Sequence, residues 1–223
     1  MQQIIIAGAG GFGREVAFLI EEINRRERQW EILGFVDDSE ALQGAAVNGY
    51  PVLGTIESLA RREEPAAVAL AVGKPALRRQ LAERLAGLRQ LSFPNLISPD
   101  AHISLATCKL GHGCILCAGA VVTVNVQIGN FFLCNLGATV GHDCLIGDYV
   151  TCYPGVHISG GSAIGAGAEL GTGCSVIPGR IVGADTIIGA GAAVIRDLPS
   201  GCTAVGVPAR PIKIREEGGY PAL

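Results

Sequence analysis

The segment GHDCLIGD places His142 directly before Asp143, in a stretch that otherwise consists of small and branched apolar residues. An imidazole can accept a proton near neutral pH, and a carboxylate can orient the ring and stabilise the imidazolium that forms. Neighbouring residues in a strand point to opposite faces, so the two side chains can meet only at a corner or loop. The pair is predicted to be a general base and its partner; the alternative is a surface histidine at a corner.

Metal binding is a second chemistry that histidine supplies. The chain has four histidines, and His112 and His142 occupy equivalent places in the six-residue repeat described below. They are 30 residues apart, which is not a whole number of 18-residue turns; His157 has a different place in its repeat, and His102 precedes the regular coil. Cys114 and Cys117 have the C-x-x-C spacing, but no second pair accompanies them. No metal is therefore expected.

A glycine-rich loop near the start of the chain is another candidate site. Gly8, Gly10 and Gly13 have the spacing G-x-G-x-x-G, between a short apolar strand and a helical pattern, and Gly11 lies in the same loop. Backbone N–H groups at such a helix N-terminus can bind a phosphate group. A tight glycine turn with a purely structural role is the alternative.

Three charged side chains follow the strands near this loop. Asp37 and Asp38 end the second strand, where a carboxylate can reach a ribose hydroxyl. Lys74 lies between a strand and a helix, where it either contacts a phosphate or sugar or remains solvated. A dinucleotide domain needs two mononucleotide halves, whereas this domain is small. A mononucleotide, such as the UDP or GDP of an activated sugar, therefore fits better than NAD.

Residues 1–93 are predicted to form a small Rossmann-like α/β domain that positions these groups. Strands are expected over residues 3–8, 31–38 and 66–73, helices over 11–28 and 75–87, and a short helix from 58 to 64. Alternation of strands and helices predicts a parallel sheet with helices on its faces.

From residue 110 onward the pattern changes to a six-residue period. Every sixth residue is aliphatic or Cys: Leu110, Leu116, Val122, Ile128, Cys134, Val140, Ile146, Cys152, Ile158, Ile164, Leu170, Val176, Val182, Ile188 and Val194. A second, mostly small column lies four residues after the first: Cys114, Ala120, Ala138, Cys144, Val150, Val156, Ser162, Ala168, Cys174 and Ala192. Arg180 is an exception in this second column.

This period indicates a parallel β-helix in which three short strands make one turn. Residues 94–223 are therefore predicted to be an all-β β-helix domain with a C-terminal tail. The aliphatic column is expected to point inward, and the glycine that often follows it, as in Ile146-Gly147, to supply backbone angles that other residues resist. Cysteines in the two columns are expected to be buried thiols in a reducing compartment. His142 and Asp143 lie in neither column, so packing leaves them available for chemistry.

Composition supports this picture. The chain has 223 residues, of which 49% are hydrophobic, 17% charged and 5% aromatic, with 32 glycines; this suits a repetitive β architecture. A formal net charge of −3 argues against nucleic acid as a partner. The N-terminal segment has no basic region typical of a signal peptide, and no apolar run is long enough to span a bilayer. We expect a cytoplasmic protein without membrane insertion.

Residues 110–198 resemble the hexapeptide-repeat acyltransferases, and GAGGFGREV, GFVDD, GHDCLIGD and GVPARPI narrow the resemblance. The whole chain is similar to the bacterial sugar acetyltransferases that include sialic acid O-acetyltransferases and nucleotide-linked amino-sugar N-acetyltransferases. This resemblance implies a left-handed β-helix, a homotrimer, acetyl-CoA between neighbouring β-helices, and a sugar nucleotide held by the N-terminal domain. It favours N-acetylation of a nucleotide-linked amino-deoxy sugar; O-acetylation of sialic acid or another sugar hydroxyl is the alternative. It leaves the sugar and the nucleotide open.

The resemblance also implies roles for individual residues. It makes His142 the general base, places Asn135 near the acceptor group, and gives the backbone N–H of Gly160 the role of stabilising the tetrahedral oxyanion. Asn135 could instead be a corner residue with left-handed backbone angles. Gly160 and Gly161 are expected to contact acetyl-CoA, and Arg210 or Lys213 to meet its phosphates, or else to be solvated. Some family members have a second histidine where this chain has Thr151.

Outside the acetyltransferases, a zinc hydratase and a non-catalytic β-helix scaffold are the competing functions. Metal analysis of the purified protein distinguishes a zinc hydratase from an acetyltransferase, and a measurement of CoA binding distinguishes a scaffold from an acetyltransferase.

Overall fold

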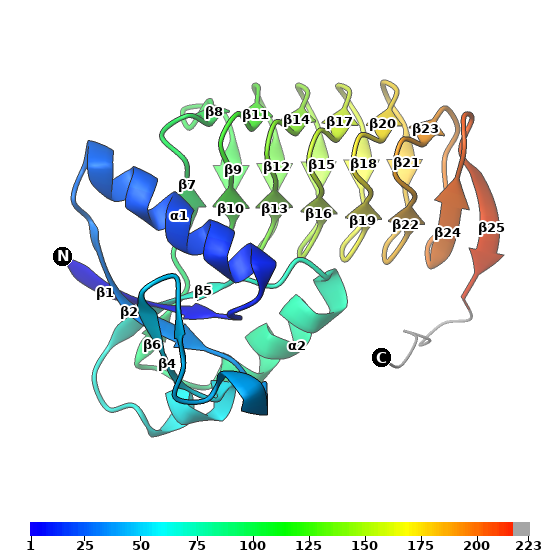
Figure 1. Ribbon diagram of the computed structural model, residues 1–223. Helices are drawn as coiled ribbons and strands as arrows, with labels where there is room; N and C mark the ends of the chain where they lie inside the picture. The colour runs from blue at the N-terminus through cyan, green and yellow to red at the C-terminus, as the bar shows by residue number, and fades with distance from the viewer. Residues whose placement is uncertain (216–223) are drawn as a thin grey trace. The chain divides into compact units, whose positions relative to one another are not determined.

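The structure is a computed structural model that describes residues 1–215. The chain forms two compact units: one comprises Met1–Gly73 and Leu77–Pro99, and the other comprises Lys74–Ala76 and the chain from Asp100 onward. The first unit is an α/β domain and the second is a β-helix (Figure 1).

The first unit is built on a six-stranded sheet with the order β3-β4-β2-β1-β5-β6. All neighbours in it pair in parallel except β3 and β4. Its strands are β1 (Gln2–Ala7), β2 (Trp30–Val36), β3 (Ala46–Val47), β4 (Tyr50–Gly54), β5 (Ala66–Leu70) and β6 (Leu91–Ser92). The three strands expected from the sequence are present as the central strands β2, β1 and β5.

Helix α1 (Gly11–Arg26) packs on β1 and β2 through one apolar face that includes Val16, Leu19, Ile20 and Ile23, as the helical spacing predicts. Helix α2 (Pro75–Leu85) follows β5, with Pro75 at its first position, where a missing N–H costs nothing.

The short helix expected over residues 58–64 is instead a 3-10 helix, η2 (Ile56–Arg61). The N–H of Ser58 donates to Thr55 O and the N–H of Arg62 to Leu59 O, which are i to i−3 bonds. Pro65 follows closely and disfavours helical angles in the residue before it, so the segment is too short for a regular α-helix. A second 3-10 turn, η1, covers Glu40–Leu42.

The antiparallel hairpin β3–β4 was not expected from the sequence. Asn48 and Gly49 form its turn with φ of 48° and 85°, the left-handed angles of a tight two-residue hairpin turn. The Asn-Gly dipeptide is the signal that could have predicted it.

The second unit is a parallel β-helix whose strands are two residues long in every regular coil, as Figure 1 shows for the stack from β9 to β22. Each strand pairs with the strand 18 residues later, for example Thr139 with His157 and Val140 with Ile158. The first side of the coil contains β10 (Ile115–Leu116), β13 (Leu133–Cys134), β16 (Thr151–Cys152), β19 (Glu169–Leu170), β22 (Ile187–Ile188), β24 (Cys202–Val205) and β25 (Arg210–Ile214). The second contains β8 (His102–Ile103), β11 (Val121–Val122), β14 (Thr139–Val140), β17 (His157–Ile158), β20 (Ser175–Val176) and β23 (Ala193–Val194). The third contains β9 (Lys109–Leu110), β12 (Gln127–Ile128), β15 (Leu145–Ile146), β18 (Ala163–Ile164) and β21 (Ile181–Val182). Strand β7 (Leu96–Ile97) precedes the first coil.

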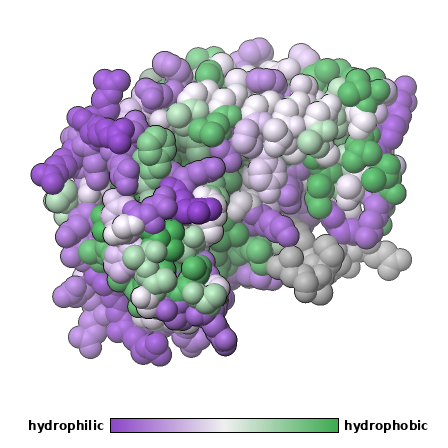
Figure 2. Space-filling model, in the orientation of Figure 1, coloured by the Kyte–Doolittle hydropathy of each residue, from purple (hydrophilic) through white to green (hydrophobic). Residues whose placement is uncertain are grey.

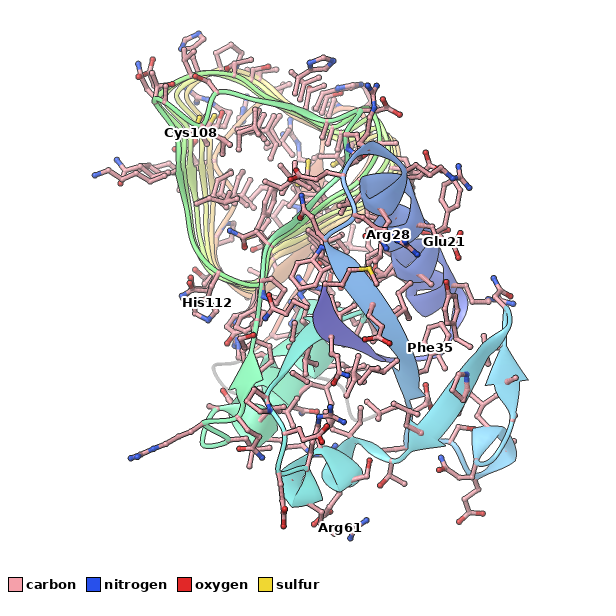
Figure 3. All side chains as sticks on the ribbon, turned by 90° about the vertical axis from the view of Figure 1, so that its left-hand side faces the viewer. Glu21, Arg28, Phe35, Arg61, Cys108 and His112 are labelled. Carbon is pink, nitrogen blue, oxygen red and sulfur yellow. The ribbon has the colours of Figure 1, made fainter. Side chains whose placement is uncertain are left out.

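The two predicted columns form the interior of this β-helix. Leu116 and every following member of the aliphatic column are buried, and Leu110 in the first coil is half-buried. The second column is buried as well, apart from Arg180. Figure 3 looks along the stacked coils, with Cys108 and His112 at the two ends of the side that contains β9.

The expected role of the glycine after the aliphatic residue was wrong. The glycines with left-handed φ lie at the corners, for example Gly161 at 69°, whereas Gly129 and Gly147 do not have such angles. A Cβ on Gly129 would lie 2.3 Å from Asp148 Oδ1, and one on Gly147 would lie 2.5 Å from Ala166 N. These glycines are required because the next coil approaches too closely for a side chain.

The C-terminal end of the β-helix carries an antiparallel hairpin, β24–β25, and exposed apolar side chains, visible in green at the right of Figure 2. They are Val205, Val207, Ile212 and Ile214. No helix among the described residues is both long and apolar enough to cross a membrane.

Candidate active site

His142 and Asp143 occupy the corner between β14 and β15, where the chain turns from one side of the coil to the next. The backbone of Asp143 has φ of 58°, in the left-handed region that Asp and Asn tolerate better than most residues. This corner breaks the alternation of a strand, so adjacent side chains can approach each other.

The two side chains form a hydrogen bond of 2.8 Å between His142 Nδ1 and Asp143 Oδ2. A carboxylate only accepts, so Nδ1 carries the proton and Nε2 of the neutral ring has a lone pair for a substrate proton. The His142 hydrogen bond, with a second one from Asn125, holds the pKa of the Asp143 carboxyl below its usual value. Both side chains are largely exposed, at 66% and 59%, so a substrate can reach them.

Gly160 lies one coil further on, directly against the imidazole. A Cβ on Gly160 would lie 2.5 Å from His142 Nε2, so only glycine leaves room for the ring in this position. The N–H of Gly161 donates to His142 O at 2.8 Å, whereas in the described part of the chain the N–H of Gly160 has no acceptor. Of the two glycines, Gly160 therefore has the N–H available for an oxyanion.

Asn135 is not part of this corner. It follows β13 at the preceding corner of the coil, so the whole of β14 separates it from His142. It is buried, its backbone is not left-handed, and its Oδ1 accepts the N–H of Leu136 at 2.7 Å. Thr151 is completely buried in β16.

Arg180 leaves the core, which explains its place in a column of small residues. Its guanidinium lies 3.7 Å from Asp197 Oδ1 and donates to Pro178 O at 3.3 Å. Its side chain is 35% exposed.

In the first unit, the glycine loop and Asp37 form one hydrogen-bonded structure. Gly8 has φ of 106°, and a Cβ on Gly13 would lie 2.0 Å from Gly8 O, so the helix can approach the strand only through glycine. Asp37 Oδ2 accepts the N–H of Ala9 at 2.8 Å, and Oδ1 accepts the N–H of Ser39 at 2.9 Å. Asp37 thus holds the loop in shape.

A cavity of about 310 Å³ adjoins this loop, lined by Gly8, Asp37, Asp38, Ile56, Val72, Leu77, Gln80, Leu81 and Arg84. Asp38 bridges two segments, because it accepts the N–H of Ile56 at 2.9 Å and forms an ion pair of 3.0 Å with Arg84. Sequence reasoning missed Arg84 and Gln80, since neither stands out among the polar residues of α2.

The remaining predicted residues lie apart from this cavity's lining. Gly10 is the N-cap of α1 and Gly11 its first residue, and a Cβ on Gly10 would meet open space. Lys74 is exposed and immediately precedes α2. Arg210 and Lys213 are exposed on β25, and the Arg210 guanidinium donates to its neighbour Ala209 O at 3.5 Å.

The third side of the β-helix carries a second hollow, of about 580 Å³, that the sequence did not predict. Its floor is formed by the outward residues Lys109, Gln127, Leu145, Ala163 and Ile181. Leu145 and Ile181 are 51% and 54% exposed, so this hollow is an apolar surface open to a ligand or to another chain. Across residues 1–215, no three His, Cys, Asp or Glu side chains are grouped so that they could hold a metal ion.

Comparisons with known proteins agree with this geometry. Residues 3–85 match the family described as the PglD N-terminal domain. The acetyltransferase domain of PglB from Neisseria gonorrhoeae, solved with acetyl coenzyme A, is 37% identical, with a TM-score of 0.86 over 95% of this chain and 99% of that one. No curated protein sequence matches this chain.

Two further solved structures are similar over almost their whole length. A histidine-to-asparagine variant of perosamine N-acetyltransferase from Caulobacter crescentus, in complex with CoA and GDP-perosamine, is 33% identical, with a TM-score of 0.85 over 96% of this chain and 98% of that one. WeeI from Acinetobacter baumannii is 33% identical, with a TM-score of 0.72 over 95% of this chain and 100% of that one. The β-helix of this chain has the left-handed fold that these structures share.

Proposed function

Since this chain belongs to the family of hexapeptide-repeat nucleotide-sugar acetyltransferases, we propose that it transfers the acetyl group of acetyl-CoA to the amine of a nucleotide-linked amino-deoxy sugar. The observation that carries the proposal is the corner at His142. Its Nδ1 is held by Asp143, while its Nε2 lies against Gly160, whose N–H lacks an acceptor in the described chain.

In this proposal His142 acts as the general base. As the sugar nitrogen attacks the thioester carbon, Nε2 takes the proton that the nitrogen loses, and Asp143 stabilises the imidazolium. The carbonyl oxygen becomes an oxyanion that the N–H of Gly160 stabilises. When the C–S bond breaks, the sulfur takes the proton from Nε2, which returns the ring to its starting state and leaves an N-acetyl sugar and CoA.

The first unit is proposed to bind the nucleotide. The open N-terminus of α1 at Gly10 and Gly11 presents backbone N–H groups that suit a diphosphate. The adjoining cavity, with the carboxylates of Asp37 and Asp38 on its wall, suits a ribose or a base.

A homotrimer is proposed; the number three rests on the family resemblance, and two features of this chain support association of several copies. Asn135 and His142 lie at different corners of one coil, so a site that uses both needs Asn135 from one chain and His142 from another. The apolar hollow beside Leu145 and Ile181 also offers a surface on which a second β-helix and acetyl-CoA can meet. Gly160 and Gly161 are proposed to contact the acetyl-CoA arm and Arg210 its phosphates, in the cytoplasm, where acetyl-CoA is present.

The test is incubation of the purified protein with acetyl-CoA and a panel of UDP-, GDP- and dTDP-linked amino sugars, with mass spectrometry of the product. We expect one member to gain an acetyl group that resists mild base, as an amide does. An acetyl group lost in mild base would identify an ester and favour the O-acetyltransferase alternative. Sialic acid and other sugars without an amine belong in the panel for that reason.

A further inference from the structure

Asn125 lies one coil before the proposed base and contacts its carboxylate partner. Its Nδ2 donates to Asp143 Oδ1 at 3.2 Å, while the other oxygen of the same carboxylate, Oδ2, accepts from His142 Nδ1 at 2.8 Å. The three side chains therefore form a chain of hydrogen bonds, from amide to carboxylate to imidazole.

The backbone of Asn125 fits this position as well as its side chain does. One corner of the β-helix repeats left-handed angles every 18 residues, at Asn125, Asp143, Gly161 and Gly179, with φ of 57°, 58°, 69° and 70°. The two later positions of this corner, Gly161 and Gly179, are glycines and contribute no side chain to the site. Asn and Asp tolerate left-handed angles better than most other residues with side chains, and here they occupy the two coils that form the hydrogen-bonded chain.

Asn125 is itself held by the coil before it. The N–H of Asn125 donates to Thr107 Oγ1 at 3.3 Å, and that hydroxyl also hydrogen-bonds Ser104 Oγ at 2.8 Å. The N–H of Asp143 donates to Val124 O at 3.1 Å, which fixes the spacing of the two corners. Backbone hydrogen bonds to both neighbouring coils thus place Asn125, in addition to the contact between its side chain and the Asp143 carboxylate.

We propose that Asn125 is a positioning residue for the reaction: it holds the Asp143 carboxylate in the rotamer that meets His142 Nδ1, and so keeps the proton on Nδ1 and the lone pair on Nε2. Asp143 is mostly exposed, so without a second partner its carboxylate can rotate into solvent. This inference rests on the proposed role of His142 as base.

Two substitutions separate the amide from the backbone that carries it. Asn125→Gly removes the donor but keeps a residue that readily adopts left-handed angles, and Asn125→Asp keeps the shape but turns the donor into a charged acceptor that faces Asp143. We expect kcat to fall about 3-fold in Asn125→Gly and about 10-fold in Asn125→Asp, with KM for both substrates unchanged. Asp185→Gly, at a different left-handed corner with φ of 53°, is the matched control and should leave kcat unchanged.

The decisive readout is the tautomer of His142, measured by ¹⁵N NMR of the neutral imidazole in histidine-labelled protein. Only four histidines are present, and His142→Gln assigns the signal. We expect the Nδ1-protonated form to dominate in the original protein and in Asp185→Gly, and the Nε2-protonated form to gain population in both Asn125 variants. Unchanged tautomers and unchanged kcat in both variants would overturn the role of Asn125. If His142→Gln itself retained full activity, the proposed function would fail instead.

Discussion

The imidazole of His142 rests against the Cα of Gly160, so closely that a methyl group on Gly160 would lie 2.5 Å from Nε2. The base and the proposed oxyanion donor are thus fixed relative to each other by direct contact. They come from two successive coils, whose spacing the β-helix determines.

Gly160→Ala should therefore be a folded but nearly inactive protein. Gly160 does not have left-handed angles, and the atoms that the new methyl group meets belong to a side chain that can rotate away. Folding should be little affected, whereas His142 must leave its position, and we expect kcat to fall about 100-fold or more. Thermal melting checks that the variant folds, and steady-state kinetics check the loss of kcat. Gly87→Ala, where a Cβ would meet open space, is the control, and an active Gly160→Ala would contradict the assignment.

Gly13→Ala should instead destabilise the first unit. The new Cβ would lie 2.0 Å from Gly8 O, a backbone atom that cannot move without displacing the strand or the helix. We expect a loss of more than about 2 kcal/mol in the free energy of unfolding, measured by denaturant titration. Gly10→Ala, which meets open space, should change stability by less than about 0.5 kcal/mol. Equal effects of the two substitutions would show that the close approach of Gly13 and Gly8 is not required.

The Asp143 carboxylate should titrate in acid, below the usual range of aspartate. The hydrogen bonds from His142 and Asn125 favour its charged form and lower its pKa in the folded protein. A depressed pKa means that this contribution to stability is present above the unfolded pKa of about 3.9 and disappears as pH falls through the folded value. The difference in the free energy of unfolding between the original protein and Asp143→Asn should thus be constant around neutral pH. It should decrease only below about pH 4, where Asp143 becomes protonated. At neutral pH, Asp143→Asn should also lower kcat about 10- to 100-fold. A stability difference that closes near pH 6 would contradict the account.

Cys108 should be the only thiol of the folded protein that reacts rapidly with a disulfide reagent. It is half-buried in the first coil, whereas the other seven cysteines are buried. Burial raises the pKa of the Cys174 thiol to about 12, and it raises those of Cys134 and Cys152 as well, so few thiolates are present in the core. We expect one fast thiol per chain in native protein and eight in denaturant, counted by absorbance.

Cys108→Ser should remove the fast phase of that reaction and leave the slow thiols unchanged. Several fast thiols in the native protein would mean that the coils open in solution.

The β-helix could be predicted from the sequence because its packing repeats. Val140 and Ile146 occupy the interior because every sixth residue does. His142 and Asp143 belong to neither interior column, so the sequence pattern identified them as residues available for chemistry. The structural reason for each glycine was harder to predict, because glycine is required both at a left-handed corner and where two coils approach closely. Gly161 is an example of the first and Gly147 of the second, and only backbone angles tell them apart.

Some of the site depends on contacts that no local pattern contains. Asn125 meets Asp143 only because 18 residues make one coil and both corners are left-handed. The spacing is visible in the sequence, but the direction of the amide is not. Similarly, Asp37 ends a strand as expected, but its carboxylate binds the N–H of Ala9, so its first role is to hold the glycine loop.

The most direct test of the central claim is the rate of CoA release by His142→Ala with acetyl-CoA and the amino sugar that the panel identifies. If His142 is the base, kcat falls about 1000-fold, while calorimetry shows unchanged binding of both substrates and sedimentation shows an unchanged oligomer. A His142→Ala variant that releases CoA at the rate of the original protein would contradict the account.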